Sequence, residues 1–126
     1  MKKKINIAVV GLGQVGIYLL NELNIKKKEI ELKSGKKINI VAVSAKNINK
    51  KRRFKVNKKI FFKNPLDIFK FTHVDILFEV IGQSDGISKK IVETALINKT
   101  HVITPNKALI SKHGDYLAKL AEINNV

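Results

Sequence analysis

Three glycines near the start of the chain, Gly11, Gly13 and Gly16, have the spacing G-x-G-x-x-G, which can bring backbone amides around a phosphate. They follow an apolar run at residues 5–10 and precede residues 14–23, whose apolar side chains have helical spacing. In this context Gly11 would allow a tight turn, Gly13 would let a pyrophosphate approach the backbone, and Gly16 would let the helix lie close to the sheet. A glycine-rich turn can also arise by chance, but its place between a strand and a helix favours a dinucleotide site, with the phosphates at the helix N-terminus.

A second group that could act in chemistry is Lys107, in the sequence Thr104-Pro105-Asn106-Lys107. Pro105 prevents further strand pairing after residues 101–104, and Asn106 is a good helix cap. This arrangement would hold Lys107 at the lip of a nucleotide crevice, near the place of a nicotinamide. An exposed lysine is most often a solvated charge, yet its position at a strand end favours a role in the site.

The residues after the second predicted strand indicate which cofactor is preferred. NAD-binding domains place an acidic residue there, which binds the ribose 2′-hydroxyl. This chain has no acid at residues 43–47, whereas Lys46, with Lys50, Lys51 or Arg52 nearby, could neutralise a 2′-phosphate, and Ser44 could donate a hydrogen bond. These lysines could instead only solvate a loop. We therefore predict NADP over NAD, with NAD still possible.

The elements that must position these residues alternate along the chain. Apolar strands separated by amphipathic helices are typical of a doubly wound α/β domain with a parallel sheet, a Rossmann-type fold, here over residues 1–126. The carboxyl ends of the strands would meet in one crevice. Strands are expected at residues 5–10, 38–44, 60–62, 74–81 and 101–104, and helices at 14–23, in a short segment after Pro65, at 84–98 and from 106 onward.

Several local features are also expected. A basic connection would span residues 25–37 with its turn at Ser34-Gly35, and a long basic loop would span residues 45–59. Ser84 or Asp85 would cap the helix after the fourth strand. Gly114 would break or kink the last helix. The short helix after Pro65 would bury Leu66, Ile68, Phe69 and Phe71.

Composition excludes several classes of protein. The 126 residues contain no cysteine, so disulfides and thiolate chemistry are excluded, and a cytoplasmic location is expected. The lysine-rich start resembles a signal peptide only in part, and no apolar run is long enough to span a bilayer. The three histidines lack metal-ligand spacing, so no metal site is predicted.

The net charge of +15 could indicate a nucleic-acid partner. However, the lysines are spread along the chain, and the one dense block, residues 50–53, has no interleaved aromatic side chains on which bases could stack. We therefore predict no nucleic-acid partner and no membrane partner.

Four segments in order resemble homoserine dehydrogenase: IAVVGLGQVG, VAVSAKNINKKRRF, VDILFEVIG and ALINKTHVITPNKALISKHGDYLAKLAE. The resemblance covers essentially the whole chain, but only the nucleotide-binding domain of that family. It implies reversible reduction of L-aspartate 4-semialdehyde to L-homoserine with NADPH or NADH, on the route to threonine, methionine and isoleucine. Another amino-acid or semialdehyde dehydrogenase, or a nucleotide-sensing domain without catalysis, remains an alternative.

The resemblance also implies roles for single residues. Lys107 would lie near nicotinamide and substrate and polarise the substrate carbonyl, Gly82 and Thr104 would line the nicotinamide side, and Glu79 would order the crevice without acting as a base. Cofactor contacts are expected from Gly11, Gly13, Gln14, Val15, Gly16, Ser44, Lys46, Gly82, Thr104 and Lys107.

The chain also departs from that family. Gln83, Pro105 and Lys46 replace residues that are frequent there, and Lys lacks the planar fork of Arg. The resemblance implies a further domain that makes most substrate contacts and forms the homo-oligomer, and we expect these 126 residues not to include it. We therefore expect this chain alone to bind a nucleotide but to turn over substrate poorly.

Overall fold

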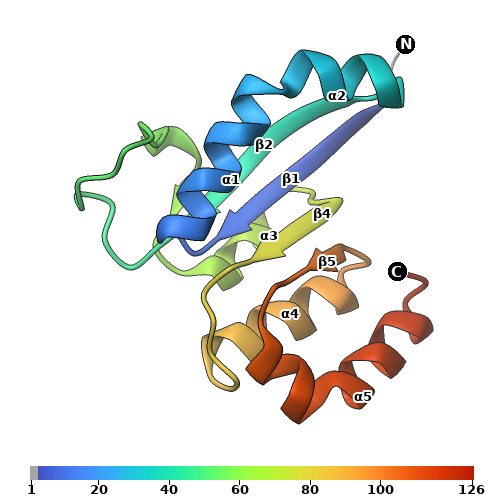
Figure 1. The fold of residues 1–126 in the computed structure, drawn as a ribbon. Helices are drawn as coiled ribbons and strands as arrows, with labels where there is room; N and C mark the ends of the chain where they lie inside the picture. The colour runs from blue at the N-terminus through green and yellow to red at the C-terminus, as the bar shows by residue number, and fades with distance from the viewer. Residues whose placement is uncertain (1–2) are drawn as a thin grey trace.

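The apolar run at the start of the chain forms β1 (Lys4–Val10), the central strand of a five-stranded parallel sheet. The structure is a computed structural model that describes residues 3–126 (Figure 1). Residues Ile7 to Val10 are at most 4% exposed, because helices cover both faces of the strand. Such burial explains why this strand is apolar without alternation.

The sheet has the strand order β3-β2-β1-β4-β5, and every neighbouring pair is parallel. This order confirms the doubly wound α/β fold expected from the sequence. The register between β1 and β2 shifts once, between Ile7 and Ala8. The remaining strands are β2 (Lys37–Ser44), β3 (Phe61–Phe62), β4 (Ile76–Glu79) and β5 (His101–Ile103).

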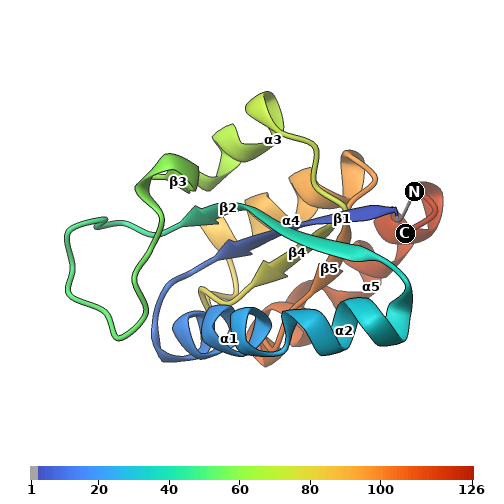
Figure 2. The ribbon, with the colours of Figure 1, turned by 90° about the horizontal axis from the view of Figure 1, so that it is seen from above.

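Helices lie on both sides of this sheet, as Figures 1 and 2 show. On one face α1 packs Leu20 against Ile7, Val9 and Val43. On the other face α4 and α5 cover Ala8, Val10 and Leu77. The helices are α1 (Gln14–Ile25), α2 (Lys27–Ser34), α3 (Ile68–Phe71), α4 (Ile87–Ile97) and α5 (Lys107–Ile123), with 3₁₀ turns at Lys58–Ile60 and Pro65–Asp67.

The second helix corrects the expectation of an irregular connection at residues 25–37. Lys27–Ser34 is helical although none of its residues is buried. An ion pair between Lys33 and Glu29, 2.8 Å long and one helical turn apart, supports it. The expected turn at Ser34-Gly35 is confirmed, because Gly35 ends the helix in the left-handed region at φ +70°.

Three further expectations were wrong, namely the cap of α4, a break at Gly114 and the burial of Phe71. Neither Ser84 nor Asp85 caps α4, whose N-cap is Gly86, because Asp85 contacts α5 instead. Gly114 does not break the last helix, which runs from Lys107 to Ile123 with Leu109 and Leu117 buried on either side of it.

Phe71 is 76% exposed, while its ring stacks on Phe62 at a centroid distance of 6.4 Å. Leu66, Ile68 and Phe69 do face the core. The predicted fourth strand, residues 74–81, is paired as a regular strand only over Ile76–Glu79.

One part of the sheet is covered on one face only. In the edge strand β5, Val102 faces the α4 and α5 side, whereas His101 is exposed and Ile103 is half exposed. Among residues 3–126, no helix is both long and apolar enough to cross a membrane.

Candidate functional site

The strand order predicts a ligand crevice at the carboxyl ends of the central strands. From β1 the chain adds β2 and β3 towards one edge of the sheet and then β4 and β5 towards the other, so the direction of growth reverses between β1 and β4. In open α/β sheets the ligand crevice lies beyond the carboxyl ends of the strands at such a switch point. The β1–α1 turn and the long segment after β2 lie at this same end of the sheet (Figure 2). The segments that follow β4 and β5 leave the parallel sheet at the same end.

Two of the three motif glycines are required by close packing. Gly11 has φ +103°, and a Cβ there would lie 2.7 Å from the carbonyl carbon and oxygen of Val80. A Cβ on Gly16 would lie 1.9 Å from the carbonyl oxygen of Gly11. These contacts confirm the tight turn and the close helix approach expected from the sequence.

Gly13 differs from the other two because its surroundings are open. It is the N-cap of α1, its φ of −78° suits any residue, and a Cβ there would have no atom within 4 Å. No side chain caps this end of α1, and its first turn has no acidic residue. Gln14 and Val15 follow as exposed residues. The bare backbone therefore leaves room for a pyrophosphate against amides that lack partners within the helix.

The basic segment after β2 meets the glycine turn from the other side. Ser44 is buried, and its carbonyl accepts a 2.9 Å hydrogen bond from the N–H of Gly11. A pocket of about 540 Å³ lies between α1 and this segment. Gly13 and Gln14 line it together with Lys50, Lys51, Arg52, Arg53 and Phe54. Lys46 is exposed and lies outside this lining, so the structure brings its three expected basic companions, but not Lys46, to the pocket beside Gly13.

The other half of the crevice is organised by Glu79, the last residue of β4. Its carboxylate is fully buried and accepts hydrogen bonds from the N–H groups of Ile81 at 2.8 Å and Gly82 at 3.1 Å. It also accepts from Thr104 Oγ1 at 2.7 Å and Asn106 Nδ2 at 3.1 Å. Four donors surround this carboxylate, which fits an ordering role and leaves it no access to a substrate.

Asn106 joins the same network and positions Lys107. Its Oδ1 accepts from the N–H of Leu109 at 3.1 Å, which confirms it as the cap of α5. Its Nδ2 also donates to the carbonyl of Gln83 at 2.6 Å. Lys107 is the first residue of α5 and is exposed at the rim. The sequence identified Asn106 as a cap, but its link to Glu79 depends on a partner 27 residues away.

Asp85 fixes the segment that follows Gly82. His113 Nε2 lies 2.8 Å from its Oδ1, and Lys112 Nζ donates to its Oδ2. Hydrogen bonds from Lys112 and then from His113 lower the pKa of Asp85 to about 2. These contacts connect the β4–α4 segment to α5 on the surface.

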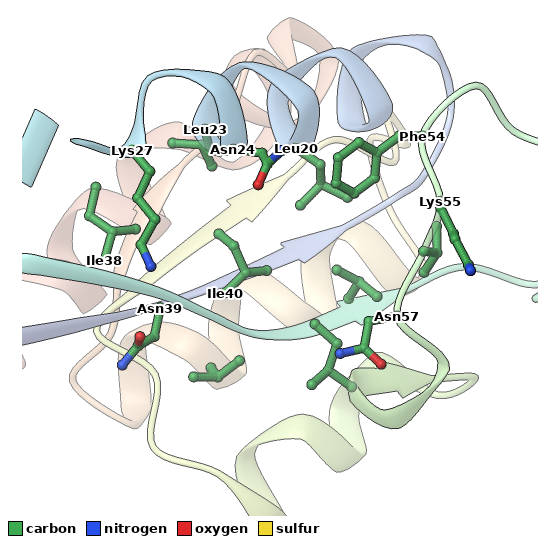
Figure 3. Close-up of a pocket in the computed structure, with 14 residues that line it drawn as sticks. Leu20, Leu23, Asn24, Lys27, Ile38, Asn39, Ile40, Phe54, Lys55 and Asn57 are labelled. Carbon is green, nitrogen blue, oxygen red and sulfur yellow. The ribbon is translucent and has the colours of Figure 1, made fainter. Parts of the chain in front are cut away.

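A second pocket, of about 600 Å³, lies between α1, β2 and residues 54–60 (Figure 3). Apolar side chains such as Leu20, Ile38, Ile40 and Phe54 line most of it. No motif glycine, nor Glu79 or Lys107, contributes to this pocket. It adjoins the pocket beside Gly13 at Phe54, which lines both, but it contains none of the predicted site residues.

Comparison with known proteins decides the family. The family model described as homoserine dehydrogenase, NAD binding domain, matches residues 11–126. The chain belongs to this family. The homoserine dehydrogenase of Neisseria gonorrhoeae is 33% identical over 98% of the chain and 28% of its own length, and that of Bacillus subtilis is 30% identical over 97% of the chain and 28% of its own length.

A solved homoserine dehydrogenase structure supports the same conclusion. The S. aureus enzyme at pH 8.5 superposes with a TM-score of 0.90 and 33% identity, over 100% of this chain and 31% of that one. The match to the homoserine dehydrogenase NAD-binding domain covers residues 11–126, and the chain spans about 28% of the length of the curated relatives. The alternative of a different dehydrogenase is not favoured by these matches.

Proposed function

We propose that this chain serves as the NAD(P)-binding part of a homoserine dehydrogenase, which reduces L-aspartate 4-semialdehyde reversibly to L-homoserine. The observation that carries the proposal is the glycine turn, where Gly13 leaves open space beside the uncapped first turn of α1. Gly11, Gly13, Gln14, Val15 and Gly16 would hold the pyrophosphate through backbone groups. The reaction would belong to threonine, methionine and isoleucine synthesis in the cytoplasm.

The β4–β5 half of the crevice would receive the nicotinamide. When bound, this cofactor supplies or accepts the hydride. Gly82 and Thr104 would line its place, because both are fixed by Glu79 at the strand ends. Lys107, exposed at the first turn of α5, would direct its ammonium group to the carbonyl oxygen of the substrate and offset the negative charge that develops there.

For the cofactor we propose NADP in preference to NAD. Beyond β2, residues 44–55 include no acidic side chain that would repel a 2′-phosphate. Ser44 and Lys46 would contact this phosphate, and Lys50, Lys51 and Arg52 would add positive charge beside it. NAD can still bind, because its contacts to the glycine turn do not depend on these groups.

Turnover would require more than these residues. The curated relatives are more than three times as long as the part matched here, since that part is 28% of their length. The remaining part of such an enzyme would supply most substrate contacts and the interface of the homo-oligomer. This chain alone would therefore bind nucleotide with little or no turnover.

Calorimetric titration of the chain with NADPH, NADH and duplex DNA at two salt concentrations tests this function. We expect heat with NADPH and weaker heat with NADH. Gly13→Ala should weaken NADPH binding at least about tenfold, since the new methyl group would occupy the proposed place of the phosphates. The free energy of unfolding should stay unchanged, because a Cβ at this position meets no other atom within 4 Å.

Gly114→Ala adds the same methyl group within α5, outside the crevice, and should leave the affinity unchanged. Salt-sensitive binding of DNA without any nucleotide binding would contradict the proposed function. Unchanged NADPH affinity in the Gly13→Ala variant would move the phosphates away from the glycine turn.

A further inference from the structure

The basic segment beside the glycine turn presents alternate side chains to the protein and to solvent. Lys51, Arg53 and Lys55 are exposed, whereas Arg52, Phe54 and Val56 are half-buried. The inward position of Phe54 and Val56 follows from their apolar character. The inward position of a charged arginine needs a different explanation.

Arg52 donates its hydrogen bonds to backbone carbonyls. Its Nη2 donates to Asn47 at 2.7 Å, and its Nη1 donates to Lys50 at 3.2 Å and Ile48 at 3.4 Å. Its Nε donates across 40 residues to the carbonyl of Leu12, at 3.3 Å, within the glycine turn. Among the described residues it forms no ion pair with a carboxylate, so its planar fork of donors serves to join the segment to the turn.

Phe54 supplies a second, apolar attachment. Its ring lies beside Leu20 of α1 in Figure 3 and packs on the core cluster that contains Leu20 and Val43. Phe54 therefore fixes where the segment returns to the core. Arg52 fixes the part that faces Gly13 through its hydrogen bonds to backbone carbonyls.

This arrangement gathers like charges in one place. Lys50, Lys51 and Arg53 lie with Arg52 around the pocket beside the first turn of α1, which carries the positive end of the helix dipole. Without an anion these groups repel one another and the segment gains no stability from their proximity. Held in this position, the segment presents its positive charges to an anion at the first turn of α1.

We propose that Arg52 is a positioning residue of the dinucleotide site, which holds the basic segment against the glycine turn before nucleotide arrives. The inference rests on the proposed function. In it Arg52 affects nucleotide binding indirectly, through its hydrogen bonds to the backbone carbonyls of residues 12 and 47–50. If loss of these bonds leaves the segment in place about a tenth of the time, the apparent Kd for NADPH rises about tenfold.

Two variants separate position from charge. Arg52→Ala and Arg52→Lys both lose the planar fork, and Arg52→Lys keeps the charge. Lys55→Ala is the matched control, because it removes one positive charge from an exposed position of the same segment that does not line the pocket beside Gly13. We would measure NADPH Kd by calorimetry and, without nucleotide, hydrogen exchange of the amides of residues 12–14 and 46–53.

Both Arg52 variants should bind NADPH about tenfold more weakly and exchange these amides faster. Lys55→Ala should stay within about threefold of wild type, with unchanged exchange. Wild-type affinity in Arg52→Lys, equal losses in Arg52→Ala and Lys55→Ala, or unchanged exchange in Arg52→Ala would each overturn the proposal.

The exchange measurement keeps this inference distinct from the proposed function. If wild type binds NADPH and only the Arg52 results differ from expectation, the positioning role alone fails. If wild type binds neither NADPH nor NADH, the proposed function fails, and the role of Arg52 at a nucleotide site fails with it.

Discussion

At the β1–α1 end of the crevice the surface is bare backbone, whereas at the β4–β5 end a buried carboxylate organises the chain. Gly13 has no side chain beside it and no cap on its helix. Glu79, in contrast, accepts four hydrogen bonds from two separate segments. The β1–α1 half has backbone amides at the start of α1 that no side chain caps. In the β4–β5 half the carboxylate of Glu79 is already hydrogen-bonded within the protein.

This difference separates two ways of building a binding surface. In the glycine half, shape comes from residues without side chains, so a substitution acts through steric clash at Gly11 and Gly16 or through lost access at Gly13. In the Glu79 half, shape comes from donors and an acceptor that need one another, so a substitution leaves buried groups unpaired. The following experiments test that difference, beginning with the largest expected effect.

Gly16→Ala should destabilise the fold most. The added Cβ would lie 1.9 Å from the carbonyl oxygen of Gly11, a backbone atom that cannot rotate away. We expect a loss of about 3 kcal/mol in the free energy of unfolding, measured by urea denaturation. Gly114→Ala is the control and should be neutral or stabilise by about 0.5–1 kcal/mol, since its nearest contact, at 3.2 Å, is the half-exposed side chain of Ile110. Wild-type stability in the Gly16→Ala variant would contradict the close helix contact.

Glu79→Gln should lower the free energy of unfolding by about 2 kcal/mol. The amide NH₂ of the variant would face N–H or O–H donors that have a carboxylate acceptor in the wild type. The same denaturation experiment measures it, and hydrogen exchange at Ile81 and Gly82 should become faster. Glu29→Gln removes a carboxylate from an exposed ion pair of α2 and should cost less than about 0.5 kcal/mol. Equal losses in the two variants would show that the Glu79 network adds little to stability.

Lys46→Glu tests how far the nucleotide half extends along the segment after β2. If Lys46 contacts the 2′-phosphate, the variant should bind NADPH about tenfold more weakly, or ~1.4 kcal/mol, and NADH nearly as well as wild type. Lys119→Glu, which makes the same charge change on exposed α5, is the control for net charge. Equal losses for the two nucleotides would exclude Lys46 as a phosphate contact.

The smallest effect is expected at Asp85, and it depends on pH. Hydrogen bonds from Lys112 and His113 lower its pKa from 3.8 to about 2. A lowered pKa in the folded state stabilises the fold above pH 3.8, and this contribution is lost as the pH falls from 3.8 towards 2. Asp85→Asn should lack this part of the pH dependence. An NMR titration of the Asp85 carboxyl group that gave its ordinary pKa would contradict the assignment.

Residues that act through local geometry could be predicted from the sequence. The glycine turn, the apolar strands and the Asn106 cap each depend on neighbours a few residues away. The long-range contacts could not be predicted in this way. The bonds of Glu79 to Thr104 and Asn106, and that of Arg52 to Leu12, join residues 25 to 40 positions apart.

Each error has its own physical cause. The α2 helix lacks the apolar face from which helices are predicted. The Glu29–Lys33 spacing and Gly35 are the features of its sequence that are typical of a helix. Gly114 was expected to interrupt α5, yet packing of Leu109 and Leu117 keeps the helix continuous. Asp85 was expected as a cap, but its carboxylate has partners 27 and 28 residues away.

The open space at Gly13 determines what a selection experiment on this domain could detect. A library with randomised glycine-turn positions, screened only for folded protein, would accept alanine at position 13 and reject it at position 16. A screen for retention on immobilised nucleotide would reject both. The difference between the two outputs would therefore mark, position by position, which parts of the turn encode the architecture and which encode the ligand.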